Sequence, residues 1–296
     1  MTPPPRHDDA PPPAEQRHDL QALDVRRPHL FTALIVVTVV LVLVAAHAAA
    51  SAFDLPTGRL ELAAEAALAA LAAILLTRLH AWRDVGFRPL RTSRDLRLYW
   101  IPLFPFLPVL GTAIASLAGI EPGRLASYLA LAALVGFVEE TFFRGLILRA
   151  LMARGTWRAA IVSSVLFGLA HGANLLVGAD PAATLLQVGY AAAMGFAFAA
   201  VALRTGAIWP LVIIHGLIDA VAFITADGTV ATGISKADVL VQAGYAVGFT
   251  VYGFLVMPRT GRPAATVTPL APEPLPPATP APAPGRARER AAPGTQ

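Results

Sequence analysis

Two adjacent glutamates, Glu139 and Glu140, lie in the middle of an apolar stretch that is long enough to cross a bilayer. A carboxylate at the centre of a membrane costs about 3 kcal/mol or more, and two side by side also repel each other. Arg144 follows Glu140 by four residues, so these two side chains share one face of a helix. The spacing predicts that Arg144 pairs with Glu140, while Glu139, rotated by about 100°, points elsewhere.

The other deep ionisable residues lie on two further apolar segments, with His171 on one and His215 and Asp219 on the other. Measured from the arginines at the ends of these segments, Glu139 and His171 each lie roughly 20 Å deep and His215 roughly 16 Å deep. These depths are compatible. The sequence therefore predicts that three helices bring the side chains into one polar cluster near the middle of the membrane.

These residue types favour attack of an activated water molecule on a peptide bond. Glu139 is the candidate general base, a neutral histidine could share the water, and a second histidine with a polar partner could stabilise the oxyanion. The chain contains no cysteine, which excludes a thiol nucleophile and a thiolate metal site. Ser163 and Ser164 are expected to be packing residues.

A metal-dependent mechanism is the alternative. Glu139, His171 and His215 form a two-histidine, one-carboxylate set that could hold zinc. The chain has no His-Glu-x-x-His motif, however, and a metal-free glutamate mechanism needs no further residue. Both alternatives stay open at this point.

The elements that must position these residues are transmembrane helices. Of the 296 residues, 56% are hydrophobic and only 14% are charged, whereas a soluble domain carries about a quarter charged residues. The mean hydropathy of +0.60 agrees with a polytopic, all-α membrane bundle. With about 20 residues needed per crossing, the apolar runs predict about eight transmembrane helices. They are expected at 30–52, 59–80, 98–119, 125–152, 157–174, 182–203, 207–226 and 238–257.

The cationic residues near the ends of these helices are unevenly distributed. With the N-terminus inside, the inner segments hold Arg26, Arg27, Arg78, Arg83, Arg88, Arg91, Arg94, Arg97, Arg149, Arg154, Arg158, Arg204, Arg259 and Arg262. The outer segments hold Arg59, Arg124 and the only lysine, Lys236. By the positive-inside rule this predicts that both termini are inside, and it attributes the basic excess to membrane orientation, with no nucleic-acid partner.

The two ends of the chain differ from the rest in composition. Residues 1–28 and 258–296 are rich in proline and are expected to be disordered tails, so residues 29–257 form the predicted transmembrane domain. His47 on the first span is expected to be structural. Glu61 and Glu65, at the start of the second span, are expected to meet headgroups or the helix N-terminus.

Three short motifs resemble a known family. Glu139-Glu140-Thr-Phe-Phe-Arg144 matches E-E-x-x-x-R, Phe167-Gly-Leu-Ala-His171 matches F-x-x-x-H, and His215-Gly-Leu-Ile-Asp219 matches H-x-x-x-(D/N). In this order, the motifs resemble the CPBP or Abi family, which comprises type II CAAX prenyl protease-like endopeptidases and bacteriocin-processing or self-immunity proteins. The resemblance covers about 98–226, so the first two spans and the last are expected to be a variable periphery.

The resemblance implies an intramembrane endopeptidase, often called a metalloprotease, whose site opens toward the cytoplasm. It implies that Glu139 is the base that activates water, that Glu140 and Arg144 support it, and that His171 orients or activates the water.

The resemblance also implies that His215 and Asp219 stabilise the oxyanion. Family members have either Asn or Asp at the last position. An Asn donates a hydrogen bond directly, whereas an ionised Asp cannot. Asp219 is therefore expected either to stay protonated or to orient His215.

The predicted location is the cell membrane, with the lipid bilayer and a peptide or membrane-protein substrate as partners. The arginine bias indicates a GC-rich bacterial genome, in which prenylated substrates are not expected. A signal or leader peptide, a bacteriocin precursor or a membrane regulator is an equally open substrate class, and the sequence does not choose among them. The competing functions are a non-catalytic immunity or scaffold protein of the same fold and a transporter, although the chain lacks the repeated halves of many transporters.

Overall fold

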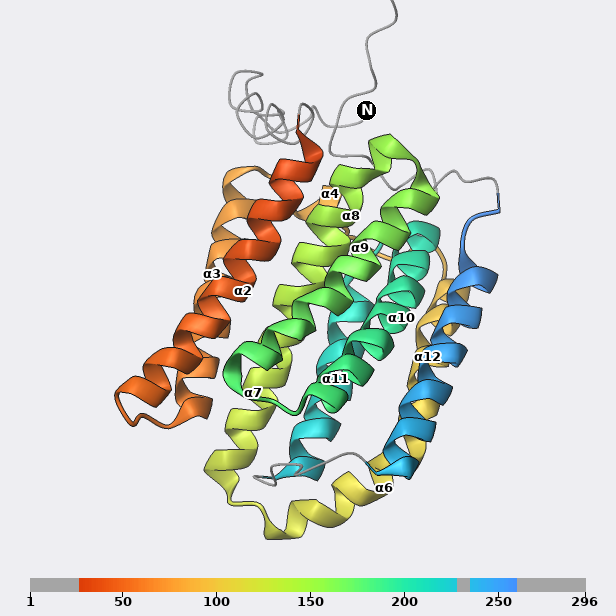
Figure 1. Cartoon of the computed structure of the whole chain (residues 1–296). Helices are drawn as coiled ribbons and strands as arrows, with labels where there is room; N and C mark the ends of the chain where they lie inside the picture. The colour runs from red at the N-terminus through yellow and green to blue at the C-terminus, as the bar shows by residue number, and fades with distance from the viewer. Residues whose placement is uncertain (1–26, 228–234, 260–296) are drawn as a thin grey trace, which may run out of the picture.

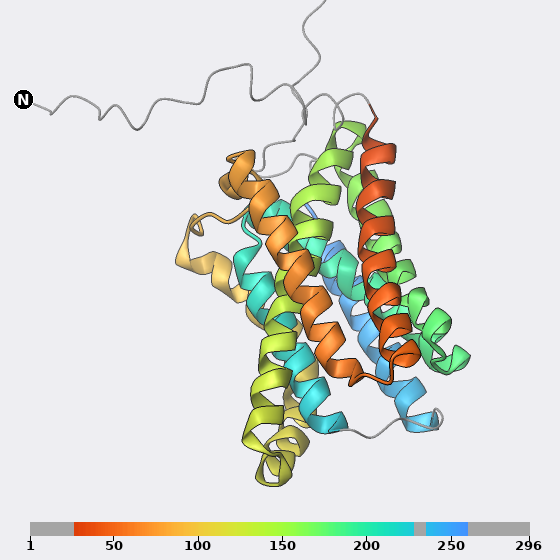
Figure 2. The same ribbon diagram turned by 90° about the vertical axis from the view of Figure 1, so that its left-hand side faces the viewer.

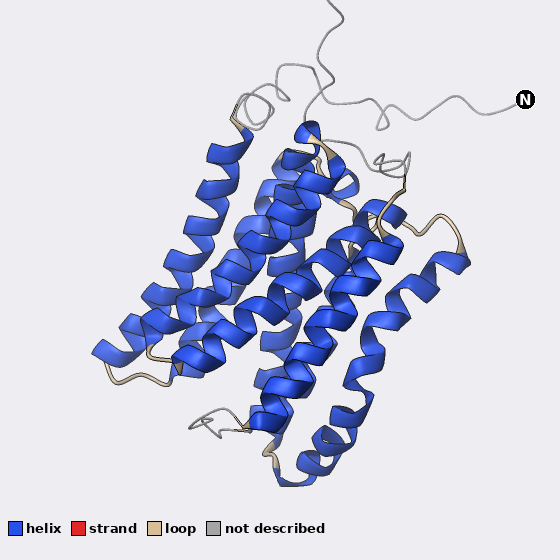
Figure 3. Ribbon diagram, turned by 45° about the vertical axis from the view of Figure 1, so that its right-hand side comes forward, coloured by secondary structure: helices blue, strands red, loops and turns tan. Residues whose placement is uncertain are grey.

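The chain folds into a bundle of long helices that run side by side between two ends of the molecule (Figure 1). We describe a computed structural model, which defines residues 27–227 and 235–259. Within these ranges the ordered elements are helices and no strand is present (Figure 3). Six of these described helices are long and apolar enough to cross a membrane, which confirms the predicted all-α, multi-pass architecture.

The eight predicted spans are all helical. The elements are α2 (Pro28–Ala52), α3 (Thr57–Arg78), α4 (Trp82–Val85), η3 (Ser93–Leu96), α5 (Arg97–Trp100), η4 (Ile101–Phe106), α6 (Leu107–Ser116), η5 (Leu117–Gly119), α7 (Pro122–Glu139), η6 (Glu140–Ile147), α8 (Leu148–Leu151), η7 (Met152–Arg154), α9 (Thr156–His171), η8 (Gly172–Val177), α10 (Pro181–Thr205), α11 (Trp209–Ala226) and α12 (Lys236–Val256). The predicted tails, 1–28 and 258–296, fall almost entirely outside the described residues.

Two spans depart from regular α-helix. The third is broken by the 3₁₀ segment η4, which contains Pro102 and Pro105, and Pro108 lies in the first turn of α6. Proline lacks an amide donor and interrupts the α-helical ladder, so the predicted bend is confirmed. The fourth span continues from α7 into α8 through a π-helix, η6, which the sequence did not predict.

The helices pack around α7, α10 and α11. Helix α10 packs on α9 and α12, while α11 packs on α7 and α6. Helices α2 and α3 form an antiparallel hairpin that lies against α7 on one side of the bundle (Figure 2). This hairpin covers the face of α7 from which the predicted catalytic glutamate projects.

The cationic side chains mark the two ends of the bundle. One end, which we call the arginine-rich end, carries the described residues Arg27, Arg78, Arg83, Arg88, Arg91, Arg94, Arg97, Arg149, Arg154, Arg158, Arg204 and Arg259. The opposite, arginine-poor end carries Arg59, Arg124 and Lys236. The fold therefore preserves the uneven distribution on which the orientation was predicted.

Candidate active site

At the centre of the site is a buried ion pair between Glu140 and Arg144. Nη1 of Arg144 donates to Oε1 of Glu140 at 2.8 Å, and Glu140 is fully buried. Nδ1 of His215, on α11, lies 2.8 Å from the same oxygen. Because a carboxylate oxygen can only accept, Nδ1 carries the proton of this bond. The predicted pair is therefore present, and His215 completes what we call the buried node: Glu140, Arg144 and His215.

Two aromatic rings enclose the buried node. The guanidinium carbon of Arg144 lies 4.0 Å from the ring centroid of Phe167 and 5.5 Å from that of Phe198. The imidazole of His215 meets the same two rings edge-on, at 5.9 and 6.0 Å between centroids. A cation over a ring face is attracted by the ring quadrupole, which offsets part of the cost of removing Arg144 from water.

A close crossing of α7 and α11 brings the glutamates to His215. A Cβ added at Gly136 would lie 2.7 Å from the carbonyl oxygen of Val212 and 2.8 Å from the backbone nitrogen of Gly216. The two helices thus touch backbone to backbone, one turn before the glutamates. Small residues permit such an approach inside a membrane.

Ser164, Gly168 and Gly172, spaced four residues apart, form a row of small residues along the segment that carries His171. A Cβ at Gly168 would lie 2.6 Å from the carbonyl oxygen of Val188, so Gly168 allows close packing of α9 on α10 and not on the glutamates. Nothing lies within 4 Å of a Cβ at Gly172. The row fixes α9, and with it His171, against α10.

The π-helix η6 begins at Glu140 and contains Arg144. Its last bond runs from the backbone N–H of Leu148 to the carbonyl oxygen of Phe143, five residues earlier. Ser163 of α9 donates to the same oxygen at 2.9 Å, so Ser163 supports this turn as well as packing. Single π turns are often found at functional sites.

Glu139 has a different environment from its neighbour. Its side chain is 17% exposed and lines a cavity of about 220 Å³, whereas Glu140 lines none of that surface. Oε2 of Glu139 is 3.4 Å from Nε2 of His215 and has no hydrogen-bond partner in the described part of the chain. Glu140 is thus held by Arg144 and His215 at 2.8 Å, whereas Glu139 reaches the cavity and approaches His215 at the longer distance.

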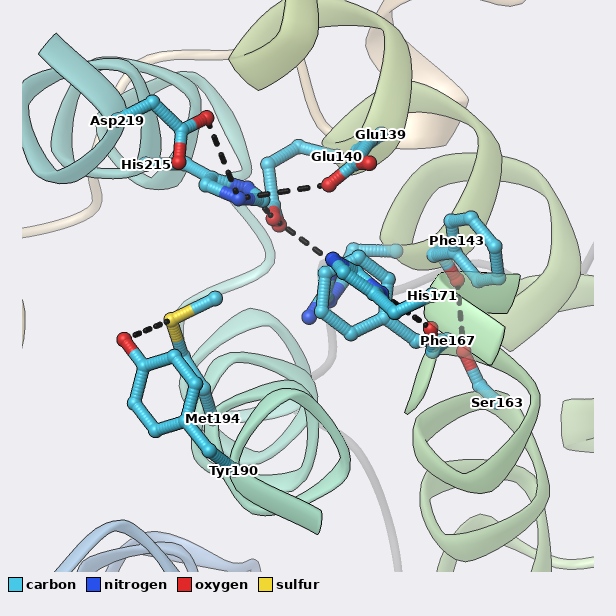
Figure 4. Close-up of polar contacts among 11 residues, drawn as sticks. Glu139, Glu140, Phe143, Ser163, Phe167, His171, Tyr190, Met194, His215 and Asp219 are labelled. Carbon is cyan, nitrogen blue, oxygen red and sulfur yellow. Dashed lines mark hydrogen bonds and ion pairs between the residues drawn. The ribbon is translucent and has the colours of Figure 1, made fainter. Parts of the chain in front are cut away.

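Asp219 approaches the same nitrogen from the other side. Its Oδ2 lies 3.7 Å from Nε2 of His215, so this nitrogen faces two carboxylates (Figure 4). Nδ1 already donates to Glu140, and Nε2 can therefore donate only from a doubly protonated ring. If the ring is singly protonated, Nε2 is an acceptor. In that case the carboxyl group of Glu139 or of Asp219 must carry the proton of any hydrogen bond to Nε2.

His171 completes the predicted set without touching the glutamates. Its Nδ1 lies 2.9 Å from the carbonyl oxygen of Phe167 and donates to it, which leaves Nε2 as an acceptor. The ring lines the same cavity as Glu139. Helices α7, α9 and α11, with the π-helix η6 that continues α7, thus bring all six predicted residues to one region, as Figure 4 shows for those that it labels.

The cavity also contains polar residues that the sequence analysis placed elsewhere. His47 of α2 and Glu61 and Glu65 of α3 line it together with Glu139 and His171. The expectation that Glu65 meets headgroups is wrong, because its side chain is only 4% exposed. Glu61 and Glu65 are four residues apart, so one helix face carries both. That spacing, in an apolar helix, was the signal that could have identified them.

The predicted zinc ligands do not converge. Across the described residues, no three His, Asp or Glu side chains lie where they could hold a metal ion. Both ring nitrogens of His215 face carboxylates, and His171 uses Nδ1 for Phe167. The arrangement of Glu139, His171 and His215 therefore does not fit a zinc site.

The cavity lies toward the arginine-poor end of the bundle. Its lining includes His47 near the end of α2, Glu61 near the start of α3, and Val177 just before α10, all of which adjoin the turns at that end. His47, Glu61 and Val177 are partly exposed, whereas Glu65 is buried. With the predicted N-in orientation, this end of the bundle would face away from the cytoplasm, whereas the resemblance implies an opening toward the cytoplasm.

Comparison with known proteins agrees with the motifs. Residues 121–221, which include all six predicted site residues, match the family described as type II CAAX prenyl endopeptidase Rce1-like. No curated protein and no solved structure matches the chain. With the intramembrane helices and the arrangement of the three motifs, this match identifies a type II CAAX prenyl endopeptidase Rce1-like domain in residues 121–221 of a multi-pass membrane protein.

Proposed function

We propose that the protein is an intramembrane endopeptidase in which Glu139 activates the water that hydrolyses a peptide bond. One observation carries the proposal: of two adjacent glutamates, Glu140 is fully buried and bound to Arg144 and His215, whereas Glu139 is partly exposed and lines a cavity. A general base must reach its water, and of the two adjacent glutamates Glu139 is the one that lines the cavity.

In the proposed reaction, Glu139 removes a proton from a water molecule in the cavity. The water oxygen attacks the carbonyl carbon of the peptide bond, and Glu139 then returns the proton to the departing amine. His171 can orient this water by accepting a hydrogen bond from it at Nε2, because Nδ1 donates to the carbonyl oxygen of Phe167.

His215 and Asp219 are the proposed partners of the oxyanion. A proton shared between Nε2 and Oδ2 would provide the donor that the carbonyl oxygen needs as its charge develops. Glu140 holds the other side of the His215 ring at 2.8 Å, and Arg144 holds Glu140. These two residues thus position the donor without touching the substrate.

We propose that the arginine-rich end faces the cytoplasm, in accord with the positive-inside rule. Because the cavity lies toward the other end, a substrate segment would enter it from the extracytoplasmic half of the membrane. A leader peptide or a membrane regulator is the substrate class that this access favours.

The absence of cysteine makes this orientation directly testable. Val177→Cys should react with a membrane-impermeant maleimide on intact cells. Arg158→Cys, at the arginine-rich end, should react only after permeabilisation. The reverse pattern would contradict the proposed access.

The test of the activity is comparative proteomics of cells that carry the wild-type protein or Glu139→Gln. Shortened membrane or secreted peptides should appear with the wild-type protein and disappear with the variant. Asp84→Asn, an exposed carboxylate at the arginine-rich end, is the control and should match wild type. Identical peptide sets in wild type and Glu139→Gln would instead favour the non-catalytic immunity or scaffold function.

A further inference from the structure

A buried carboxylate on the N-terminal hairpin has no function in the mechanism above. Glu65 of α3 is 4% exposed, and its Oε2 has no hydrogen-bond partner among the described residues. It lines the cavity that also contains Glu139, and α3 packs directly on α7. A buried polar group without a partner is costly, so a partner supplied by a ligand would remove that cost.

Among the described residues, no arginine or lysine lines the cavity. Its lining includes the carboxylates of Glu61, Glu65 and Glu139 and the imidazoles of His47 and His171, but no arginine or lysine. Arg144, the nearest buried cation of the site, is paired with Glu140. The lining therefore provides an excess of negative charge, with Glu61 and Glu65 on one face of α3 and Glu139 on α7.

The space is large enough for more than a water molecule. A volume of about 220 Å³ is several times the approximately 30 Å³ that one water takes in the liquid. Much of the remaining lining is aliphatic, including Val39, Leu43 and Val135. An elongated side chain with an apolar stem and a cationic head fits both parts of such a lining.

We propose that Glu61 and Glu65 form an acidic subsite that binds a lysine or arginine side chain of the substrate close to the scissile bond. This inference rests on the proposed endopeptidase function and adds a substrate class to it. Glu65 binds the cationic head in the buried part of the cavity, and Glu61, one turn nearer the arginine-poor end, strengthens the attraction. The subsite distinguishes substrates, because basic residues are rare on the extracytoplasmic side of membrane proteins.

The test measures binding and does not depend on cleavage. The protein is prepared in nanodiscs as Glu139→Gln, which keeps the probe intact. The probes are two fluorescein-labelled leucine-alanine peptides that differ at one position near one end, with arginine in the first and glutamine in the second. Dissociation constants are measured by fluorescence anisotropy. The arginine peptide should bind at least about tenfold more tightly than the glutamine peptide, a difference of about 1.4 kcal/mol.

Adding Glu65→Gln should abolish this preference by weakening only the binding of the arginine peptide. Glu61→Gln should reduce the preference less, and Asp84→Asn should leave it unchanged. Equal or undetectable binding of the two peptides overturns the proposal, as does a Glu65→Gln variant that weakens both peptides equally, since that indicates a structural role. If selectivity is found but wild-type protein cleaves nothing in cells, the subsite stands and the endopeptidase function fails.

Discussion

The buried node and the cavity are supplied by two adjacent residues, Glu140 and Glu139. Both regions contain glutamate and histidine side chains, but these side chains have different surroundings in the two regions. In the buried node, Glu140 has Arg144 and His215 at 2.8 Å, and phenylalanine rings enclose the group. The cavity is lined by Glu139 and Glu65, whereas Glu140 and Arg144 are not part of its lining. A buried carboxylate that is held by a cation stabilises the fold, whereas a carboxylate that lines a cavity can be reached by a ligand or a proton.

The comparison predicts the largest loss of stability at Arg144. Arg144→Met leaves Glu140 buried without its cation, which costs about 3–5 kcal/mol and lowers Tm by on the order of 10 °C. Thermal unfolding in detergent measures the change. Arg158→Met removes an exposed arginine from the next helix and should leave Tm unchanged. An Arg144→Met protein with wild-type Tm would show that the ion pair does not stabilise the node.

The next largest difference between the two regions is expected from substitution of the two histidines. His215→Ala removes a member of the buried node and should lower both Tm and activity. His171→Ala removes a cavity residue and should lower activity by about 10²-fold or more while leaving Tm near wild type. Cleavage assays and thermal unfolding of the two variants provide the comparison. If His171→Ala lowers Tm as much as His215→Ala does, His171 stabilises the fold, as the members of the buried node do, and this prediction fails.

A smaller effect is expected where the two helices touch. Gly136→Ala introduces a Cβ 2.7 Å from the carbonyl oxygen of Val212 and should push α7 away from α11, at a cost of about 1–3 kcal/mol. Gly189→Ala is the matched control, because nothing lies within 4 Å of its added Cβ. If both variants unfold at the wild-type temperature, the close crossing does not position the glutamates.

The smallest effect is expected on removing metal. Since Glu139, His171 and His215 do not converge as ligands, dialysis against a strong chelator should leave cleavage unchanged. Elemental mass spectrometry of the same sample verifies that zinc is absent. Activity that falls on chelation and returns with zinc would contradict the metal-free mechanism.

Local spacing predicted the parts of the site that lie within one helix. Glu140 and Arg144 are one turn apart, so their pairing follows from helix geometry. Hydropathy likewise predicted the eight helical segments, because membrane crossing requires long apolar runs.

Tertiary packing decided the rest. The π turn at Glu140 depends on the neighbouring helix, since Ser163 of α9 supports its carbonyl. The spacing of Glu61 and Glu65 marks a polar face of α3, but Glu65 becomes part of the cavity because the α2–α3 hairpin lies against α7, which that spacing does not specify. The position of the cavity also depends on where the hairpin packs, because residues of α2 and α3 form part of its lining.

The most direct test of the central claim substitutes each glutamate of the pair in turn and measures both Tm and peptide cleavage. We predict that Glu139→Gln retains the wild-type Tm and loses cleavage by about 10³-fold or more, the effect of removing a general base. Glu140→Gln, in contrast, should lower Tm substantially because it breaks the buried node. Wild-type cleavage by Glu139→Gln, or the same loss of Tm in both variants, would contradict the assignment of different functions to the two residues.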